Sequence, residues 1–170
     1  MQAMVGPPPS FEQLIEGSVS RIHRAALGFL GDEQSAREAA QEALTRAYAA
    51  RGRYDPGRPF YPWMYRIVKN TCLDILRSRR RRPQAAVEVE RLAASGPSPL
   101  EEVSAAQLQR RLWRAMSQLQ DDHQEILNLR HFQDLSYAEI SALLDIAEGT
   151  VMSRLYRARR ALAASMKEGA

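Results

Sequence analysis

The sequence predicts an all-α protein of two small helical domains joined by a flexible linker, the second of them a helix-turn-helix. Apolar residues recur at spacings of three and four along most of the chain, which is the period of a helix with one buried face. No stretch shows the alternation of apolar and polar residues that a half-buried strand needs. From 83 to 99 the helical period lapses, and the segment ends in Gly-Pro-Ser-Pro, which is typical of a linker. We therefore expect domains over 10–82 and 100–166.

The composition excludes several classes of protein. With 170 residues, of which 45% are hydrophobic and 26% charged, the chain is globular rather than disordered. No run approaches the roughly eighteen apolar residues of a membrane span, and the start has no secretory-signal pattern, so we expect a cytoplasmic protein. Cys72 is the single cysteine, and the three histidines lack ligand-like spacing. We therefore expect no disulfide, no metal and no cofactor.

Charge is distributed unevenly along the chain. Residues 10–82 hold fourteen Lys and Arg against eight Asp and Glu, a net +6, whereas residues 83–170 hold ten against twelve, a net −2. A cationic first half indicates a nucleic-acid surface. The alternative explanation is an arginine-rich composition that reflects only a GC-rich genome.

The first domain begins with two helices that carry capping signals. Ser10 and Gln13 form a capping-box pattern, and the apolar spacing that follows predicts one amphipathic helix over 11–30. Ser35 and Glu38 form a second such pattern ahead of a helix whose apolar stripe is mostly alanine. Because interaxial distance depends on side-chain size at the contact, that stripe allows another helix to approach closely.

The third helix is long and basic. Pro62 lies where a first helical turn tolerates proline, because the missing N–H has no partner to lose there. One face repeats apolar residues, and the polar face carries Arg66, Asn70, Asp74 and Arg77 before the run Arg79–Arg82. This face predicts binding of a polyanion. Asp74 and Arg77 can instead form a simple ion pair, and the arginine run can be a solvated helix end.

The second domain ends in the predicted helix-turn-helix. Ser98 and Glu101 open its first helix, and Asp121 or Asp122 caps the next. The remaining signals are a capping box at Ser136 and Glu139, a turn at 145–147 in which Asp145 accepts a left-handed conformation, and a last helix from about Glu148. The second helix of such a motif normally enters the major groove of DNA. Its expected base-reading residues are Thr150, Ser153, Arg154 and Arg157.

Two stretches resemble a known family. Residues 54–83 read YDPGRPFYPWMYRIVKNTCLDILRSRRRRP, and residues 135–162 read LSYAEISALLDIAEGTVMSRLYRARRAL. They resemble the two conserved domains of bacterial RNA polymerase sigma factors, in the compact extracytoplasmic-function branch that has only these domains and a linker. The resemblance implies a protein that is not an enzyme. It implies one that binds core polymerase and directs promoter-specific initiation by recognising −10 and −35 elements.

The resemblance also implies roles for individual residues. Those implied to bind the clamp coiled coil of the largest polymerase subunit are Glu38, Gln41 and Glu42. Those implied to recognise and melt the −10 element are Phe60, Trp63, Arg66 and Asn70. Those implied to contact the −35 element are Arg130, Ser153, Arg154 and Arg157. The implied partners are the polymerase core (clamp and flap region), promoter DNA and an anti-sigma factor, with nucleoid association when the chain is bound to polymerase.

Two places depart from the family pattern. On the second helix, Arg37 replaces an acidic residue, and Ala39 and Ala40 replace larger apolar residues, which predicts an altered clamp contact. On the last helix, Met152 stands where Lys or Arg is usual, which removes one expected DNA contact.

Two other functions compete with the one that the resemblance implies. A stand-alone helix-turn-helix regulator is the alternative, although it leaves the basic first domain without a task. An enzyme is disfavoured because the sequence has no paired carboxylates, metal-ligand cluster, Gly-rich phosphate loop or nucleophile elbow. The expected linker also fits a promoter reader: its seventeen residues span at most about 55–60 Å, which matches roughly 16 base pairs at about 3.4 Å each.

Overall fold

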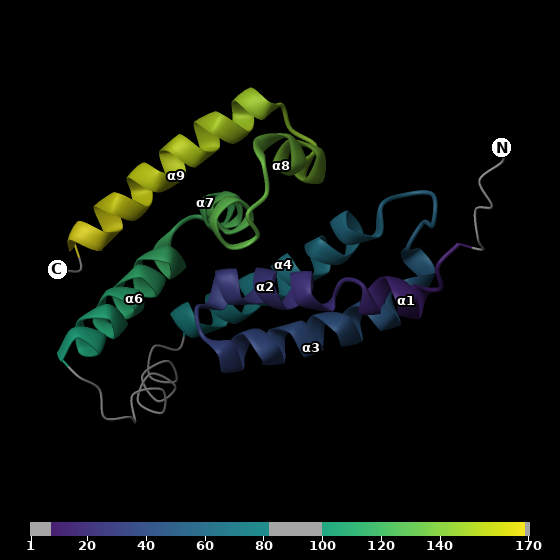
Figure 1. Ribbon diagram of the computed structural model, residues 1–170, viewed down its shortest axis with the longest axis horizontal. Helices are drawn as coiled ribbons and strands as arrows, with labels where there is room; N and C mark the ends of the chain where they lie inside the picture. Colours follow the sequence, from purple (N-terminus) through teal and green to yellow (C-terminus); the bar gives the residue numbers. More distant parts are fainter. Residues whose placement is uncertain (1–7, 82–99, 169–170) are drawn as a thin grey trace.

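The computed structural model of the chain describes residues 8–81, here the first module, and 100–168, the second module. Every regular element in these residues is a helix, as predicted (Figure 1). The first module contains α1 (Phe11–Glu16), α2 (Val19–Leu30), α3 (Glu33–Ala49), the 3-10 helix η1 (Arg51–Arg53) and α4 (Phe60–Arg81). The second module contains α6 (Leu100–Gln118), α7 (Asp121–Leu127), the π-helix η2 (Asn128–Phe132), α8 (Tyr137–Leu144) and α9 (Glu148–Glu168). The expected linker and the expected cap at Ser98 lie outside the described residues.

The helix predicted over 11–30 is in fact two helices. Its capping box is present, because Gln13 N donates to Ser10 Oγ at 3.3 Å and Ser10 N donates to Gln13 Oε1 at 2.8 Å. The chain then breaks at Gly17 and Ser18, where the Ser18 hydroxyl donates to Leu14 O at 2.8 Å. The prediction of one continuous helix is wrong because the apolar spacing continues across this two-residue break.

The cap predicted for α3 is also wrong. Asp32 is the N-cap, since its Oδ1 accepts from Ser35 N at 2.7 Å, so Ser35 lies inside the helix rather than ahead of it. The buried Ser35 hydroxyl instead accepts a hydrogen bond from Arg79 on α4. The predicted alanine stripe is confirmed and packs α3 closely against α2 and α4; its members are Ala36, Ala39, Ala40, Ala43 and Ala47.

The helix α4 supplies much of the core of the first module. Pro62 lies in its first turn, as predicted. Met64, Val68 and Cys72 are fully buried along one face. Cys72 packs as a small apolar residue, and burial raises the pKa of its thiol to about 12. The thiol is therefore protonated at physiological pH and unreactive.

The basic end of α4 is bound to other parts of the chain. Arg80 Nε donates to Ser117 O of α6 at 2.7 Å, and Arg79 Nη1 lies 3.7 Å from Asp32 Oδ2. A solvated helix end is therefore wrong for these two arginines. The ion pair of Asp74 with Arg77 is present, with 3.6 Å between Oδ1 and Nη1.

The helix-turn-helix of the second module forms as predicted. Ser136 N donates to Glu139 Oε2 at 2.8 Å and Glu139 N donates to Ser136 Oγ at 3.2 Å, which completes the capping box. Asp145 is left-handed, with φ 54°, and α9 begins at Glu148. The cap predicted at Asp121 or Asp122 is wrong, because Gln120 is the N-cap and makes no side-chain capping bond.

The two modules pack against each other in one continuous core. The helix α2 contacts both η2 and α6, and α7 lies between α9 and the helices of the first module (Figure 1). The far end of α9 is tied to α6: Arg111 Nη2 donates to Met166 O at 3.2 Å, and Ser165 Oγ donates to Gln118 Oε1 at 3.2 Å. The last helix is therefore held along its length.

The alanine stripe of α3 predicts a sensitivity to side-chain size. Ala43 is fully buried, so Ala43→Leu should lower the free energy of unfolding by about 1–3 kcal/mol through overpacking. Ala49→Leu, at the exposed end of the same helix, should change it by less than about 0.5 kcal/mol. Urea unfolding followed by circular dichroism measures both. Equal effects of the two variants would contradict close packing at Ala43.

Candidate nucleic-acid interface

An aromatic cluster surrounds the start of α4. Phe60 is buried and Trp63 is half-buried, with 5.6 Å between their ring centroids. Phe11 of α1 and Tyr54 of the preceding loop pack on Trp63 at 6.0 and 5.4 Å between centroids. Of the two aromatic residues that the sequence predicts for melting, Phe60 therefore supports the cluster from inside, and Trp63 presents the more accessible ring.

The polar face of α4 continues from this cluster. Arg66 and Asn70 are exposed and lie one turn apart. Among the residues that the structure describes, neither side chain makes a hydrogen bond or ion pair, so both are available to a ligand. One turn further on, the Asp74 carboxylate lies between Arg46 of α3, at 3.4 Å, and Arg77.

The predicted polymerase-binding residues share the outer face of α3. Glu38, Gln41 and Glu42 are all exposed. Two of them are ordered by neighbours on the same helix, since Gln34 Nε2 donates to Glu38 Oε1 at 2.6 Å and Arg46 Nε donates to Glu42 Oε1 at 2.8 Å. We call Glu38, Gln41 and Glu42 the acidic strip of α3. The orientations of its two carboxylates are fixed by side chains of α3 itself.

The departures at Ala39 and Ala40 fall on the opposite side of α3. Both alanines are buried against the neighbouring helices. They therefore act on the spacing of the core rather than on the exposed acidic strip. The substitution that does alter the exposed surface is Arg37, whose Nη2 lies 3.4 Å from Glu33 Oε1.

The predicted base-reading residues lie along the start of α9. Ser153 and Arg157 are exposed, and Thr150 and Arg154 are half-buried. Ser153 Oγ donates to Thr150 O at 3.0 Å, and Arg157 Nε donates to Ser153 O at 3.3 Å. The opposite face of the helix is buried in the module, through Val151, Leu155 and Ala158.

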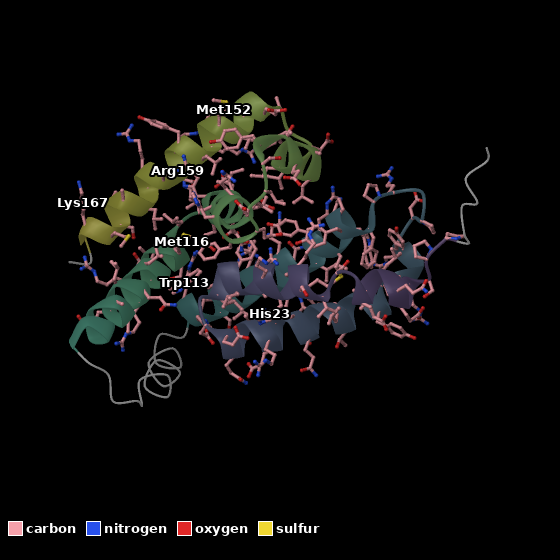
Figure 2. All side chains as sticks on the ribbon, viewed as in Figure 1. His23, Trp113, Met116, Met152, Arg159 and Lys167 are labelled. Carbon is pink, nitrogen blue, oxygen red and sulfur yellow. The ribbon has the colours of Figure 1, made fainter. Side chains whose placement is uncertain are left out.

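Two large apolar side chains also stand on the exposed side of α9. Met152 is 57% exposed and Tyr156 is 62% exposed, one turn apart. Figure 2 shows Met152 on the outer side of the helix, away from the rest of the chain. Sequence reasoning missed Tyr156. Its spacing of three from Ser153 and four from Met152 was the signal that could have found it.

Arg130 is placed differently from the residues of α9. It lies in η2 and is half-buried. Its Nη1 donates to Leu135 O at 3.1 Å and lies 3.4 Å from Asp134 Oδ1. Arg130 therefore braces the loop that leads into α8, with part of its guanidinium left accessible.

His131 lies beside α9 and adds no positive charge to it near neutral pH. Its Nε2 is 3.4 Å from Nη2 of Arg159. Partial burial, and then the charges of Arg159 and Arg130, lower the pKa of His131 below its ordinary value.

The described residues contain no group of three or more His, Cys, Asp or Glu side chains placed to hold a metal ion. No helix within residues 8–81 and 100–168 is long and apolar enough to cross a bilayer.

Comparisons with known proteins agree with this geometry. Residues 14–82 match the family described as Sigma-70 region 2, and residues 109–162 match Sigma-70, region 4. The chain is 31% identical to the RNA polymerase sigma-H factor of Pseudomonas aeruginosa, over 92% of this chain and 86% of that one. It is 35% identical to the ECF RNA polymerase sigma-E factor of Escherichia coli, over 72% and 69%. A solved structure of CnrH in complex with the cytosolic domain of CnrY is also similar, with TM-score 0.59, 25% identity, and coverage of 94% and 89%.

The contact between His131 and Arg159 of α9 predicts that the pKa of His131 depends on that arginine. Arg159→Ala should raise the pKa of His131 toward its ordinary value, because it removes a neighbouring positive charge. Arg160→Ala is the matched control, since Arg160 lies over the Tyr156 ring instead. An NMR titration of the histidine ring protons reports both pKa values. Equal shifts in the two variants would contradict the specific contact.

Proposed function

Because this chain belongs to the extracytoplasmic-function group of RNA polymerase sigma factors, we propose that it binds core polymerase and directs initiation at promoters with −10 and −35 elements. One observation carries the proposal. Each module has a helix with exposed polar side chains that other parts of the described chain do not cover: Arg66 and Asn70 on α4, and Ser153 and Arg157 on α9. Two separate reading surfaces are what two separated promoter elements require.

The acidic strip of α3 is our candidate for the polymerase contact. Glu38, Gln41 and Glu42 face solvent while the other side of the helix is buried, so a partner can reach them without unfolding the module. Charged groups at such a surface raise association rates and orient the partners. In this chain the clamp coiled coil is the proposed partner of the strip.

The start of α4 is our candidate for −10 melting. Extruding a base from duplex DNA costs a few kcal/mol. Stacking on an aromatic ring recovers about 1–3 kcal/mol per base, and a cationic track holds the backbone. Trp63 offers the ring, Asn70 an amide for the base edge, and Arg66 the charge, with Phe60 supporting the cluster from inside.

The start of α9 is our candidate for the −35 contact. Arg154 and Arg157 have the guanidinium groups that bind guanine edges or phosphates, and Thr150 and Ser153 add small donors beside them. Arg130 of η2 is the further candidate for the same promoter element. Met152 and Tyr156 add apolar surface, which suits contact with thymine methyl groups.

The regulator and the cellular location are proposed from the membership of the family. An anti-sigma factor is the proposed regulator, in line with the solved complex of the sigma factor RpoE with the anti-sigma factor NepR from Bartonella quintana. We place the activity in the cytoplasm, at the nucleoid when the chain is bound to polymerase. Run-off transcription with purified core polymerase and fragments of the source genome tests the function as a whole. Start sites that depend on this chain support it, and their absence would reject it.

Arg154 should contribute sequence discrimination at the −35 element. A bidentate contact with guanine discriminates by about 1–3 kcal/mol, so Arg154→Ala should lower activity on the preferred sequence and flatten a −35 base-substitution series. Arg110→Ala, on the exposed surface of α6, removes the same charge away from α9 and should leave the series unchanged. A uniform loss across the series would mean that Arg154 contacts only phosphate.

Asn70 should act in promoter opening. Asn70→Ala should reduce run-off transcription from duplex promoters by about tenfold or more, and a pre-melted template should restore most of it, because the base is then already unstacked. Ser78→Ala, exposed further along α4, is the matched control. The melting role would be rejected by equal defects of Asn70→Ala on duplex and pre-melted templates.

A further inference from the structure

His131 and Arg159 form a pair of nitrogen-bearing side chains beside the proposed base-reading residues. Both are exposed, and His131 Nε2 of η2 lies 3.4 Å from Arg159 Nη2 of α9. The two residues are 28 positions apart in the sequence, so the fold itself brings them together. When the imidazole is neutral, its unprotonated nitrogen can accept a hydrogen bond from the guanidinium. When it is protonated, both facing nitrogens are donors and repel each other.

Neither member of this pair has a counter-ion in the described chain. Within residues 8–81 and 100–168, no carboxylate forms an ion pair with His131 or Arg159. The other cation near the ring is Arg130, which is already paired with Asp134, with 3.4 Å between Nη1 and Oδ1. The helices α2, α7 and α8 also pack on η2, but no charged side chain that the structure describes on them bonds to the ring. The chain thus supplies two donors for an anion here but, in the part described, no carboxylate to occupy them.

The pair belongs to the flank of α9 that the proposed base-reading arginines do not use. Met152, Tyr156 and Arg159 follow one another at four and three positions, so they share one flank of the exposed side. Arg154 and Arg157 share the opposite flank. Figure 2 shows Arg159 further along the helix than Met152. A helix in the major groove has a phosphate backbone on each side, and Arg159 is the cation of this three-residue row that can reach one of them.

The position of Arg159 along α9 suits the edge of the groove. Arg159 follows Arg154 by five residues, which is about 8 Å along the helix at about 1.5 Å per residue. The major groove is about 12 Å wide, and phosphates line both of its edges. A guanidinium this far from the base-reading residues therefore reaches the edge of the groove rather than its floor. Phosphate contacts at such a position fix the register and orientation of a protein on DNA.

We propose that His131 and Arg159 together bind one backbone phosphate at the edge of the −35 element, and that His131 gains a proton as this phosphate binds. The inference rests on the proposed function and adds a backbone contact to its −35 surface. A phosphate oxygen between the two facing nitrogens accepts from both of them. The repulsion between imidazolium and guanidinium is then replaced by a pair of charge-assisted hydrogen bonds.

Binding of the phosphate and protonation of the ring are linked. In the free chain, partial burial and then the charges of Arg159 and Arg130 lower the pKa of His131. A phosphate in contact with the ring has the opposite effect on this pKa, because a neighbouring negative charge favours the imidazolium. The complex therefore binds more protons than the free chain. Affinity for DNA is highest below the pKa of His131 in the free chain, and it falls as the pH rises through the pKa of His131 in the complex.

An NMR titration of the full chain tests the contact without polymerase. The ring protons of His131 report its pKa with and without a short DNA duplex of unrelated sequence at low salt, since a phosphate contact needs no promoter. The duplex should raise the pKa of His131. Arg159→Ala should largely remove this rise, and Arg110→Ala, on the exposed surface of α6, should keep it. An unchanged pKa of His131 at saturating duplex, or an equal response to inorganic phosphate at the same phosphate concentration, would overturn the proposal.

Promoter binding by the holoenzyme gives a second readout. The affinity of wild type relative to His131→Gln should be about three- to tenfold higher at about pH 5.5 than at about pH 7.5. His131→Lys carries its charge at both pH values and should bind tightly throughout. His123→Gln, on α7, is the matched control and should follow wild type. A constant ratio of wild type to His131→Gln across this range would overturn the proposal.

Arg159→Ala should weaken all promoters alike. Its holoenzyme should lose affinity by a similar factor across the −35 base-substitution series, and its salt slope should fall by about one, because one phosphate contact is lost. A changed base preference in Arg159→Ala would overturn the assignment to phosphate. Failure of the wild-type holoenzyme to bind any promoter would reject the proposed function, and the NMR titration would still decide the phosphate contact.

Discussion

Burying the amide of Asn128 is the constraint on which the arrangement of the two modules depends. An unpaired buried amide costs about 1–3 kcal/mol, so this side chain must find partners wherever it is enclosed. The π-turn of η2 directs it at α2, where Ala25 O accepts from it and Gln133 donates to it. The absence of a side chain at Gly28 is what lets the backbone of α2 come near enough. The packing of Trp113 against Gly31, and the hydrogen bond from Arg80 of α4 to Ser117 O near the end of α6, follow from the same close approach.

Helix caps and turns could be predicted from the sequence where the interacting residues are only a few positions apart. The capping boxes at Ser10 and Ser136 and the left-handed Asp145 are satisfied by neighbours three to five positions away, and all three are in the structure. The break at Gly17 was missed because the apolar spacing continues across it, and the cap at Asp32 was missed because Ser35, three residues later, carries a capping-box pattern of its own. Such choices are made by packing, which spacing alone does not report.

The contact between modules was not predictable in this way. Polar residues such as Lys69 and Glu125 stand on helix faces that periodicity assigns to solvent, and 56 positions of sequence separate them. The same limit affected the candidate site. Spacing placed Arg66, Asn70, Ser153 and Arg157 on exposed faces, where the structure has them. It indicated the pair of Arg77 with Asp74 but not the second pair of Arg77 with Asp121, nor the partners of Arg79 and Arg80, because those partners lie on α7, α3 and α6.

The length of α9 has a mechanical consequence. Its 21 residues form a rod of about 31 Å, whose start carries the proposed base-reading residues and whose last turns are bonded to α6 through Arg111 and Ser165. Because α9 also packs on α7 and α8, it moves together with the rest of the second module as one rigid lever. A tilt of about 10° at α6 displaces the other end by about 5 Å, more than a base-pair step. A protein that binds α6 can therefore displace the proposed base-reading residues by more than one base-pair step without contacting DNA itself.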